Sequence, residues 1–316
     1  MHSMAKKKLL CKNTRDFVLP VFNDLWKDSF DTELADTRVN YDPADCAIIA
    51  DYLDSDWTLP WKERGLPVII DHRHDSYLDE TTTESDGVLT LRAREWYWMH
   101  TCMEYHRRGH YGSVATHNPD KFFLLLMNRK RWSRDDLWTC VQPWLDQSLY
   151  SYVDLGLHID GDNIDKNNHD NNGIDQNYTN PAWYSQTQFS MISETMVTAR
   201  PYVSEKTFRA MAWQHPFLVH GSYGTLAYLQ ELGFETWNHV IDETYDLTVD
   251  HRDRLQAIQD QLTRIYEVFK KGENLFGDAV TQQKILHNYT RFYDKKLVTN
   301  MWQDQIVDPI KHFLNC

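Results

Sequence analysis

Two short charged segments of the chain carry side chains suited to binding a phosphorylated ligand. In the first, Ser204, Glu205 and Lys206 stand at the predicted start of a helix, and Glu194 lies at the end of the strand before it. A helix N-terminus offers free backbone N–H groups and the positive end of the helix dipole, which both attract phosphate. Ser204 and Glu205 are also ordinary helix-capping residues, but a lysine here is mildly unfavourable unless an anion lies beside it. We therefore expect Lys206 to bind a pyrophosphate and Glu205 to accept hydrogen bonds from sugar hydroxyls.

The second charged segment, residues 128–134, follows the apolar run FFLLLM and precedes another predicted helix. Ser133 is the predicted N-cap of that helix. The order of strand, basic loop and helix again suits a phosphate, although a solvated basic loop would have the same composition. The side chains that we expect at the phosphates are Asn128, Arg131 and Arg134.

The two charged segments can form one site if the strands before them end close together. The apolar pattern of the chain predicts such strands. Short apolar runs bounded by Pro, Asp or Gly alternate with segments of helical periodicity, and near-continuous apolar runs are typical of buried parallel strands. Loops are expected at 54–65, which contains a proline, and at the Asp/Asn-rich stretch 160–180, whereas 92–110 fits a strand or a helix. The predicted strands are 17–22, 46–50, 66–70, 122–127, 188–193, 217–220 and 234–237, and helices are predicted at 225–232, at 249–271 and over most of the remainder to 314.

Alternating strands and helices predict an α/β fold of the doubly wound, Rossmann-like class. The length of 316 residues allows two such domains, and a polar stretch with glycines and a proline, 109–119, separates them. We expect domains at 1–115 and 116–299, followed by a C-terminal helical tail, 300–316, that can pack back on the first domain.

The run PYVSEKTFRAMAWQHPFLVHGS, preceded by Glu194 and Thr195, resembles the donor-binding motif of the α1,3-fucosyltransferases, which are glycosyltransferases of the GT-B fold. That motif has an acidic residue followed by Asn or Thr, a spacer, a Tyr-Val/Ile-Ser/Thr-Glu-Lys core, a helix, and a strand that ends in glycine. Residues 202–206 fit the core and 216–221 fit the strand. Thr195 stands where these enzymes usually have Asn, and the spacer is one residue longer. The longer pattern, including LAYLQELGFETWNHVIDETYD, is similar to uncharacterised phage and viral glycosyltransferases.

The resemblance implies two Rossmann-like domains facing a central cleft and a nucleotide sugar as co-substrate, with no tightly bound cofactor. It implies that Glu205 binds the ribose, that Lys206 binds the pyrophosphate, and that Arg134 or Arg131 contacts the phosphates. Lys206 and Arg134 would then assist catalysis by stabilising the departing nucleoside diphosphate. The expected donor-binding residues are Asn128, Arg131, Arg134, Glu194, Tyr202, Ser204, Glu205 and Lys206.

Transfer of a sugar with inversion needs a general base for the acceptor hydroxyl, whereas retention can proceed without one. The carboxyl ends of strands line the crevice of α/β folds, so the segment after the run PVIID is the place to look. Asp71 ranks first because it stands at that strand end, followed by His72, His74 and Asp75. A second group comprises Glu95, His100 and Glu104.

Composition excludes several classes of protein. The net charge of −13 argues against a broad grip on nucleic acid, and no stretch is apolar enough for a membrane span. The five scattered cysteines fit neither a disulfide framework nor a zinc site, so we expect reduced thiols in the cytoplasm, the host cytoplasm if the protein is viral. Two Asp-x-Asp triplets occur, at 54–56 and 160–162, but we predict no metal, because GT-B enzymes generally manage the diphosphate with cations and helix dipoles.

We therefore predict a metal-independent glycosyltransferase that moves a sugar from a nucleotide sugar to a hydroxyl acceptor bound by the N-terminal domain. The acceptor is a glycan or a hydroxymethylated base of phage DNA, and the oligomeric state stays open. The alternative is a non-catalytic nucleotide- or carbohydrate-binding module that has kept the fold. A dehydrogenase is disfavoured because the chain has no G-x-G-x-x-G turn.

Overall fold

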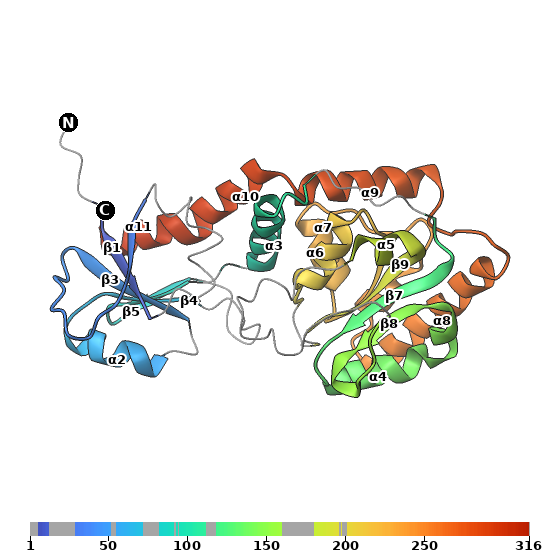
Figure 1. The fold of residues 1–316 in the computed structure, drawn as a ribbon, viewed down its shortest axis with the longest axis horizontal. Coiled ribbons are helices and arrows are strands. Elements are labelled where there is room, and N and C mark those ends of the chain that lie inside the picture. Colours follow the sequence, from blue (N-terminus) through green and yellow to red (C-terminus); the bar gives the residue numbers. More distant parts are fainter. Residues whose placement is uncertain are drawn as a thin grey trace. The chain divides into compact units, whose positions relative to one another are not determined.

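The computed structural model has a mixed α/β fold in which parallel sheets carry helices, consistent with the Rossmann-like class (Figure 1). The chain forms two compact units: unit 1 contains Met1–Gly109 and Asp294–Cys316, and unit 2 contains His110–Tyr293. The sequence-based division lay at 115 and 299. The structure describes residues 6–12, 29–51, 55–71, 82–91, 93, 95–111, 118–159, 180–195, 197 and 201–315.

Unit 1 is built on a sheet with the strand order β2-β1-β3-β4-β6-β5, in which only the pairing of β5 with β6 is antiparallel. The strands predicted at 46–50 and 66–70 are confirmed as β3 and β4, whereas 17–22 lies outside the described residues. Their apolar side chains form a buried core with those of β1. The strands are β1 (Lys8–Cys11), β2 (Asp31–Leu34), β3 (Cys46–Asp51), β4 (Val68–Asp71), β5 (Thr83–Ser85) and β6 (Val88–Leu91).

Residues 54–65 were expected to form a loop, and that prediction is wrong, because they contain helix α2 (Ser55–Glu63). Pro60 lies inside the helix, where proline removes a backbone hydrogen bond. The neighbouring Trp61 is 1% exposed and packs in the core, with the Trp57 ring 6.0 Å away. Burial of these indoles outweighs the local cost of the proline.

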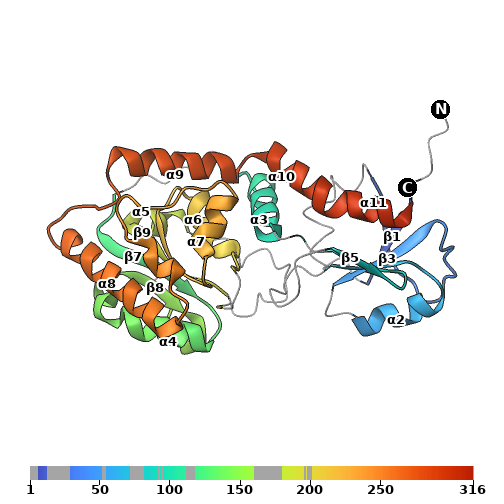
Figure 2. The same ribbon diagram turned by 180° about the vertical axis from the view of Figure 1, so that it is seen from behind.

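The other regular elements that the structure describes in unit 1 are helical. Residues 92–110, which fitted a strand or a helix, contain α3 (Trp96–Arg107). The C-terminal residues form α10 (Lys295–Trp302), a π-helical turn η7 (Gln303–Val307) and α11 (Asp308–Leu314), and α10 packs against α3. Figures 1 and 2 show α2 and α11 on opposite sides of the sheet.

Unit 2 contains an entirely parallel sheet with the order β8-β7-β9-β10. The strands predicted at 122–127, 188–193 and 217–220 are confirmed as β7, β9 and β10. Every residue of β9 and β10 is buried, which is why their sequences lack polar–apolar alternation. The strands are β7 (Lys121–Met127), β8 (Leu149–Tyr152), β9 (Thr187–Ser193) and β10 (Phe217–His220).

Helices cover both faces of this sheet. Figures 1 and 2 show α4 and α8 on one face and α6 and α9 on the other. The predicted helix at 249–271 is confirmed as α8, and Gly272 follows with a positive φ of 75°. The helices are α4 (Trp132–Val141), α5 (Pro181–Gln186), α6 (Glu205–Ala212), α7 (Thr225–Glu231), α8 (His251–Phe269) and α9 (Ala279–Phe292), with 3-10 turns η2 (Gln142–Gln147), η3 (Val153–Leu155) and η6 (Glu243–Leu247).

The strand predicted at 234–237 is absent from this described segment, so that prediction is wrong. Side chains satisfy the backbone there instead of a neighbouring strand. The N–H and C=O of Glu235 bond to the side-chain amide of Asn288, and the Trp237 N–H donates to Glu243. Helix α7 ends at Glu231 with Leu232 as its C-cap, and Gly233, the expected capping residue, follows with a positive φ of 80°.

The strand order of unit 2 creates a topological switch point. From β7 the chain passes through α4 to β8 on one side, and from β9 it passes through α6 to β10 on the other side. In open parallel sheets, the crevice between two strands whose connections diverge is where ligands bind, at the carboxyl ends of the strands. In unit 2 that crevice lies between the β7–α4 loop and the β9–α6 loop.

Candidate functional site

A buried carboxylate, Glu194, holds the end of β9 to the start of α6. Its side chain is 0% exposed and accepts hydrogen bonds from both the backbone N–H and the hydroxyl of Ser204. The hydroxyl of Thr207 donates to it at 2.6 Å, and the backbone N–H of Thr195 at 3.3 Å. Because protein donors bond to both oxygens, Glu194 fixes the β9–α6 loop. Its predicted role in binding the donor stays a prediction.

The predicted N-cap of α6 is confirmed, because the Ser204 hydroxyl accepts a hydrogen bond from the Lys206 N–H. The Lys206 ammonium donates to Glu205 at 2.7 Å, to Thr195 at 2.8 Å and to Ser204 at 3.2 Å. The lysine is thereby held over the helix N-terminus, where the dipole alone would disfavour it. Thr195, the residue that departs from the fucosyltransferase pattern, is one of the groups that hold it.

Glu205 is kept ionised by its neighbours. Its burial favours the neutral form, but the positive charges of Lys206 and Arg209 outweigh this effect and lower the pKa of Glu205 to about 2. The Glu205 side chain is 20% exposed. A charged carboxylate beside a lysine can accept hydrogen bonds from a diol while the lysine binds an anion.

The β7–α4 loop is built differently, and one prediction about it is wrong. The N-cap of α4 is Arg131 in extended conformation, and Ser133 lies inside the first turn, 3% exposed. The Arg131 side chain makes no capping hydrogen bond, so no side chain of the cap satisfies the first N–H groups of α4. Asp154 fixes the loop from behind, since it accepts from the Lys130 N–H at 2.7 Å and donates its own N–H to the Asn128 carbonyl at 3.1 Å.

Arg134 is the buried cation of the β7–α4 loop. It is 3% exposed and donates from Nη1 to the Arg129 carbonyl at 2.7 Å, while its Nε is buried with no partner among the described residues. Burial and the charge of Arg131 lower the pKa of Arg134, whereas the carboxylates of Glu205 and Glu194 act in the opposite direction. Because those carboxylates belong to the β9–α6 loop, the two charged segments found in the sequence act on each other electrostatically.

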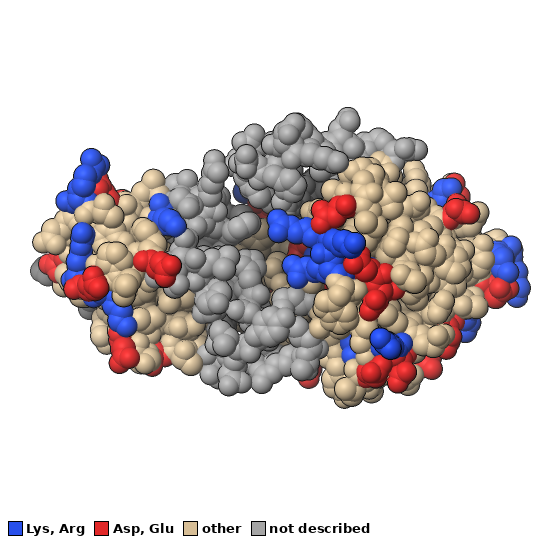
Figure 3. Space-filling view, turned by 90° about the horizontal axis from the view of Figure 1, so that it is seen from below, with Lys and Arg blue, Asp and Glu red and all other residues tan. Residues whose placement is uncertain are grey.

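The surface around this crevice is basic. Arg129, Lys130 and Arg131 are exposed. Figure 3 shows a group of Lys and Arg side chains on unit 2, bordered by acidic side chains. Exposed arginines next to a buried arginine and a helix N-terminus form a surface that favours phosphate. Of the other predicted donor-binding residues, Asn128 is half-buried in this loop and Tyr202 is buried two residues before the N-cap of α6.

The predicted general base belongs to unit 1. Asp71 is the last residue of β4, and the structure describes only its backbone. His72, His74 and Asp75 lie outside the described residues. The role of Asp71 as the general base therefore stays a prediction.

The second predicted acid–base group supports α3. Glu104 is 1% exposed and accepts hydrogen bonds from Arg107 and Arg108, which lower its pKa against the opposing effect of burial. Glu95 accepts from the Gln305 amide, and the His100 ring stacks on Trp96 at 5.6 Å. These contacts tie α3 to its own turns and to the C-terminal segment, so they have a structural role.

No cluster of three or more potential metal-ligating side chains occurs among the residues that the structure describes. The triplet at 160–162 lies wholly outside them, as does Asp54 of the other triplet. Within the described part of the chain, no helix combines the length and the apolar character needed to cross a membrane.

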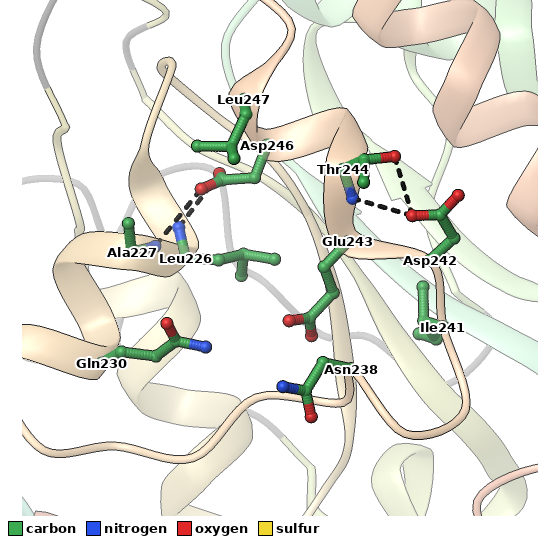
Figure 4. Close-up of a pocket in the computed structure, with 10 residues that line it drawn as sticks. All are labelled: Leu226, Ala227, Gln230, Asn238, Ile241, Asp242, Glu243, Thr244, Asp246 and Leu247. Carbon is green, nitrogen blue, oxygen red and sulfur yellow. Dashed lines mark hydrogen bonds between the residues drawn. The ribbon is translucent and has the colours of Figure 1, made fainter.

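A pocket of about 330 Å³ lies elsewhere in unit 2, between α7 and η6 (Figure 4). The Asp246 carboxylate accepts the N–H groups of Leu226 and Ala227 and so caps α7, while Glu243 accepts from Thr236 and Trp237. Burial raises the pKa of both carboxyl groups. Both carboxylates are therefore already engaged by protein donors. Its lining residues are Leu226, Ala227, Gln230, Asn238, Ile241, Asp242, Glu243, Thr244, Asp246 and Leu247.

Sequence reasoning missed three side chains of the site. Thr195 and Thr207 complete the hydrogen bonds of Lys206 and Glu194, and Arg209 adds positive charge near Glu205. Arg209 follows Glu205 by one helical turn, which is a spacing that could have pointed to their interaction. The threonines carry no such signal, since hydroxyl residues are common in loops and first turns.

No protein-family model matches the chain, and no curated protein matches it. The function proposed below therefore depends on the geometry of the crevice and on the residues of the chain.

Proposed function

We propose that unit 2 binds the nucleoside diphosphate part of a nucleotide sugar, and that the protein is a metal-independent glycosyltransferase of the GT-B type. The observation that carries this proposal is the placement of Arg134 on one loop and of the Glu205–Lys206 ion pair on the other, at the switch point of a parallel sheet, with the charge of Glu205 acting on Arg134. One cation from each loop can bind a diphosphate there, and the ionised carboxylate can accept hydrogen bonds from a ribose.

The proposed chemistry follows from the charges. The acceptor hydroxyl oxygen attacks the anomeric carbon, the bond from that carbon to the diphosphate oxygen breaks, and the nucleoside diphosphate leaves with the electron pair. Arg134 and Lys206 stabilise the negative charge that develops on the diphosphate. The acceptor proton passes to a base, for which Asp71 stays the first candidate, or to the departing diphosphate.

Isothermal titration with the common nucleoside diphosphates is the direct test. We expect at least one to bind, and Lys206→Ala to weaken binding about tenfold or more, because a charge-assisted contact to phosphate is lost. Lys296→Ala is the matched control, since Lys296 holds the same second position in α10 of unit 1 and is exposed. If no nucleoside diphosphate binds, or if both variants keep the wild-type affinity, the proposed site is wrong.

Activity separates an enzyme from a binding module. Slow release of free sugar and nucleoside diphosphate from the correct nucleotide sugar, unchanged by EDTA, is the expected result. A donor that binds but is never hydrolysed or transferred would favour the non-catalytic module. For the acceptor, transfer to hydroxymethylated duplex DNA with a steep dependence on salt would identify DNA, and transfer to a glycan alone would exclude it.

A further inference from the structure

The residue that follows the basic loop is an exposed tryptophan. Trp132 is the first residue of α4 and is 59% exposed, next to the exposed Arg131. A flat apolar ring of this size offers a large surface that a ligand with a flat face can cover. Its position directly after the cations of the β7–α4 loop puts it at the crevice of the switch point.

The ring is also braced. The His251 ring lies 4.7 Å from it at an interplanar angle of 68°, and the His251 Nε2 is 3.0 Å from the Asp136 carboxylate, one turn along α4. On its other side His251 is 5.2 Å from the ring of His220, which is 0% exposed at the end of β10. The three rings thus form a row from the buried strand end to the surface.

The inner end of this row is uncharged at neutral pH. Burial, with the nearby His251 and Arg254, lowers the pKa of His220 to about 3. His220 therefore adds no repulsion toward the cations around the crevice. An exposed aromatic face that is held in place before the ligand arrives loses little conformational freedom on binding.

On these grounds we propose that Trp132 is the stacking platform for the base of the nucleoside diphosphate, while the cations of the two loops bind its phosphates. This inference rests on the proposed function, which names the nucleotide. Base–aromatic stacking tolerates any base, because every base has a π face, so the platform supplies affinity and other groups supply base preference.

The test compares a nucleotide with its phosphate part alone. For Trp132→Ala we expect the affinity for the best-binding nucleoside diphosphate to fall about tenfold, in the range measured for stacked bases, with the affinity for inorganic pyrophosphate unchanged. Trp132→Phe should recover most of the loss because it keeps a flat ring. Leu286→Ala, which truncates a side chain that is 58% exposed on α9, is the control for loss of exposed apolar surface.

The outcomes separate the two proposals. Equal affinities of wild type and Trp132→Ala for the nucleotide would overturn the stacking platform and leave the diphosphate site intact. Equal losses for nucleotide and pyrophosphate would also overturn it, because Trp132 would then only shape the loop. Wild-type protein that binds pyrophosphate no less tightly than any nucleotide excludes a stacked base. If the wild type binds neither a nucleoside diphosphate nor pyrophosphate, both the proposed function and the stacking platform are wrong.

Discussion

The β9–α6 loop and the β7–α4 loop of unit 2 have the same position on the two sides of the switch point, but they are satisfied in opposite ways. In the β9–α6 loop the buried Glu194, the N-cap Ser204 and Lys206 bond to one another and to adjacent threonines. In the β7–α4 loop the N-cap Arg131 makes no side-chain cap, and the Nε of Arg134 has no partner among the described residues.

This difference indicates that the β9–α6 loop is rigid without a ligand, whereas the β7–α4 loop is suited to binding one. A loop whose polar groups are paired internally keeps its shape without a ligand, whereas cations and N–H groups without acceptors gain when an anion supplies them. We therefore expect substitution of the buried Glu194 in the β9–α6 loop to act mainly on stability, whereas Lys206 of the same loop also contributes to phosphate binding. Substitutions in the β7–α4 loop should act mainly on ligand binding.

The largest expected effect is that of Glu194→Ala. Removal of the carboxylate leaves the buried donors of Ser204 and Thr207 without an acceptor, and each such group costs about 1–3 kcal/mol, so we expect a loss of about 4 kcal/mol in the free energy of unfolding. Denaturation in urea measures it. Glu231→Ala on the exposed surface of α7 should change stability by less than about 0.5 kcal/mol. A loss for Glu194→Ala as small as that of the control would show that the loop is not rigid by itself.

Glu205 gives the next largest effect, and it depends on pH. Its pKa is lowered from 4.5 to about 2 in the folded protein, so its contribution is fully present above the unfolded pKa and is lost as the pH falls through the folded one. We expect Glu205→Gln to lose about 3 kcal/mol of stability at neutral pH and almost none near pH 2, from the 1.36 kcal/mol that corresponds to each pKa unit.

The measurement is the stability of wild type and Glu205→Gln by urea denaturation across this pH range. Glu267→Gln, at an exposed position of α8, serves as the control and should show a difference that stays small at every pH. A stability deficit of Glu205→Gln that is constant from neutral pH to pH 2 would mean that Lys206 and Arg209 do not stabilise the carboxylate. Glu205 would then no longer be supported as the ionised group that binds the ribose.

The β9–α6 loop, whose polar groups bond to nearby residues, was predicted better from the sequence than the β7–α4 loop. The N-cap Ser204 was predicted correctly because capping depends on residues two or three positions apart, and the buried strands β7, β9 and β10 were predicted from their apolar runs. Ser133 was assigned as an N-cap by the same rule, but α4 begins at Trp132, inside the basic loop. The cap rule identifies a suitable residue without deciding between neighbouring start points.

Contacts between segments distant in the chain were beyond prediction. The helix α2 forms around Pro60 because Trp61 reaches the core of the sheet, and 234–237 is no strand because the Asn288 side chain binds its backbone. The influence of Glu194 and Glu205 on Arg134 likewise depends on the sheet order. Local propensity says nothing about such partners, so these features required the fold.

Arg134→Met gives the smallest expected change in stability and the sharpest test of the difference between the loops. Among the described residues, no carboxylate pairs with Arg134, and its one hydrogen bond to the Arg129 carbonyl is worth about 1 kcal/mol. Replacing a buried charge with an apolar side chain of similar length removes an opposing desolvation cost. We therefore expect the stability of Arg134→Met to stay within about 1 kcal/mol of wild type, while pyrophosphate affinity falls about tenfold or more.

Arg129→Met, at an exposed position of the same loop, should change both the stability and the pyrophosphate affinity less. If Arg134→Met instead loses several kcal/mol and keeps its affinity, the arginine is a structural strut, and the two loops do not differ in the way their hydrogen bonds indicate.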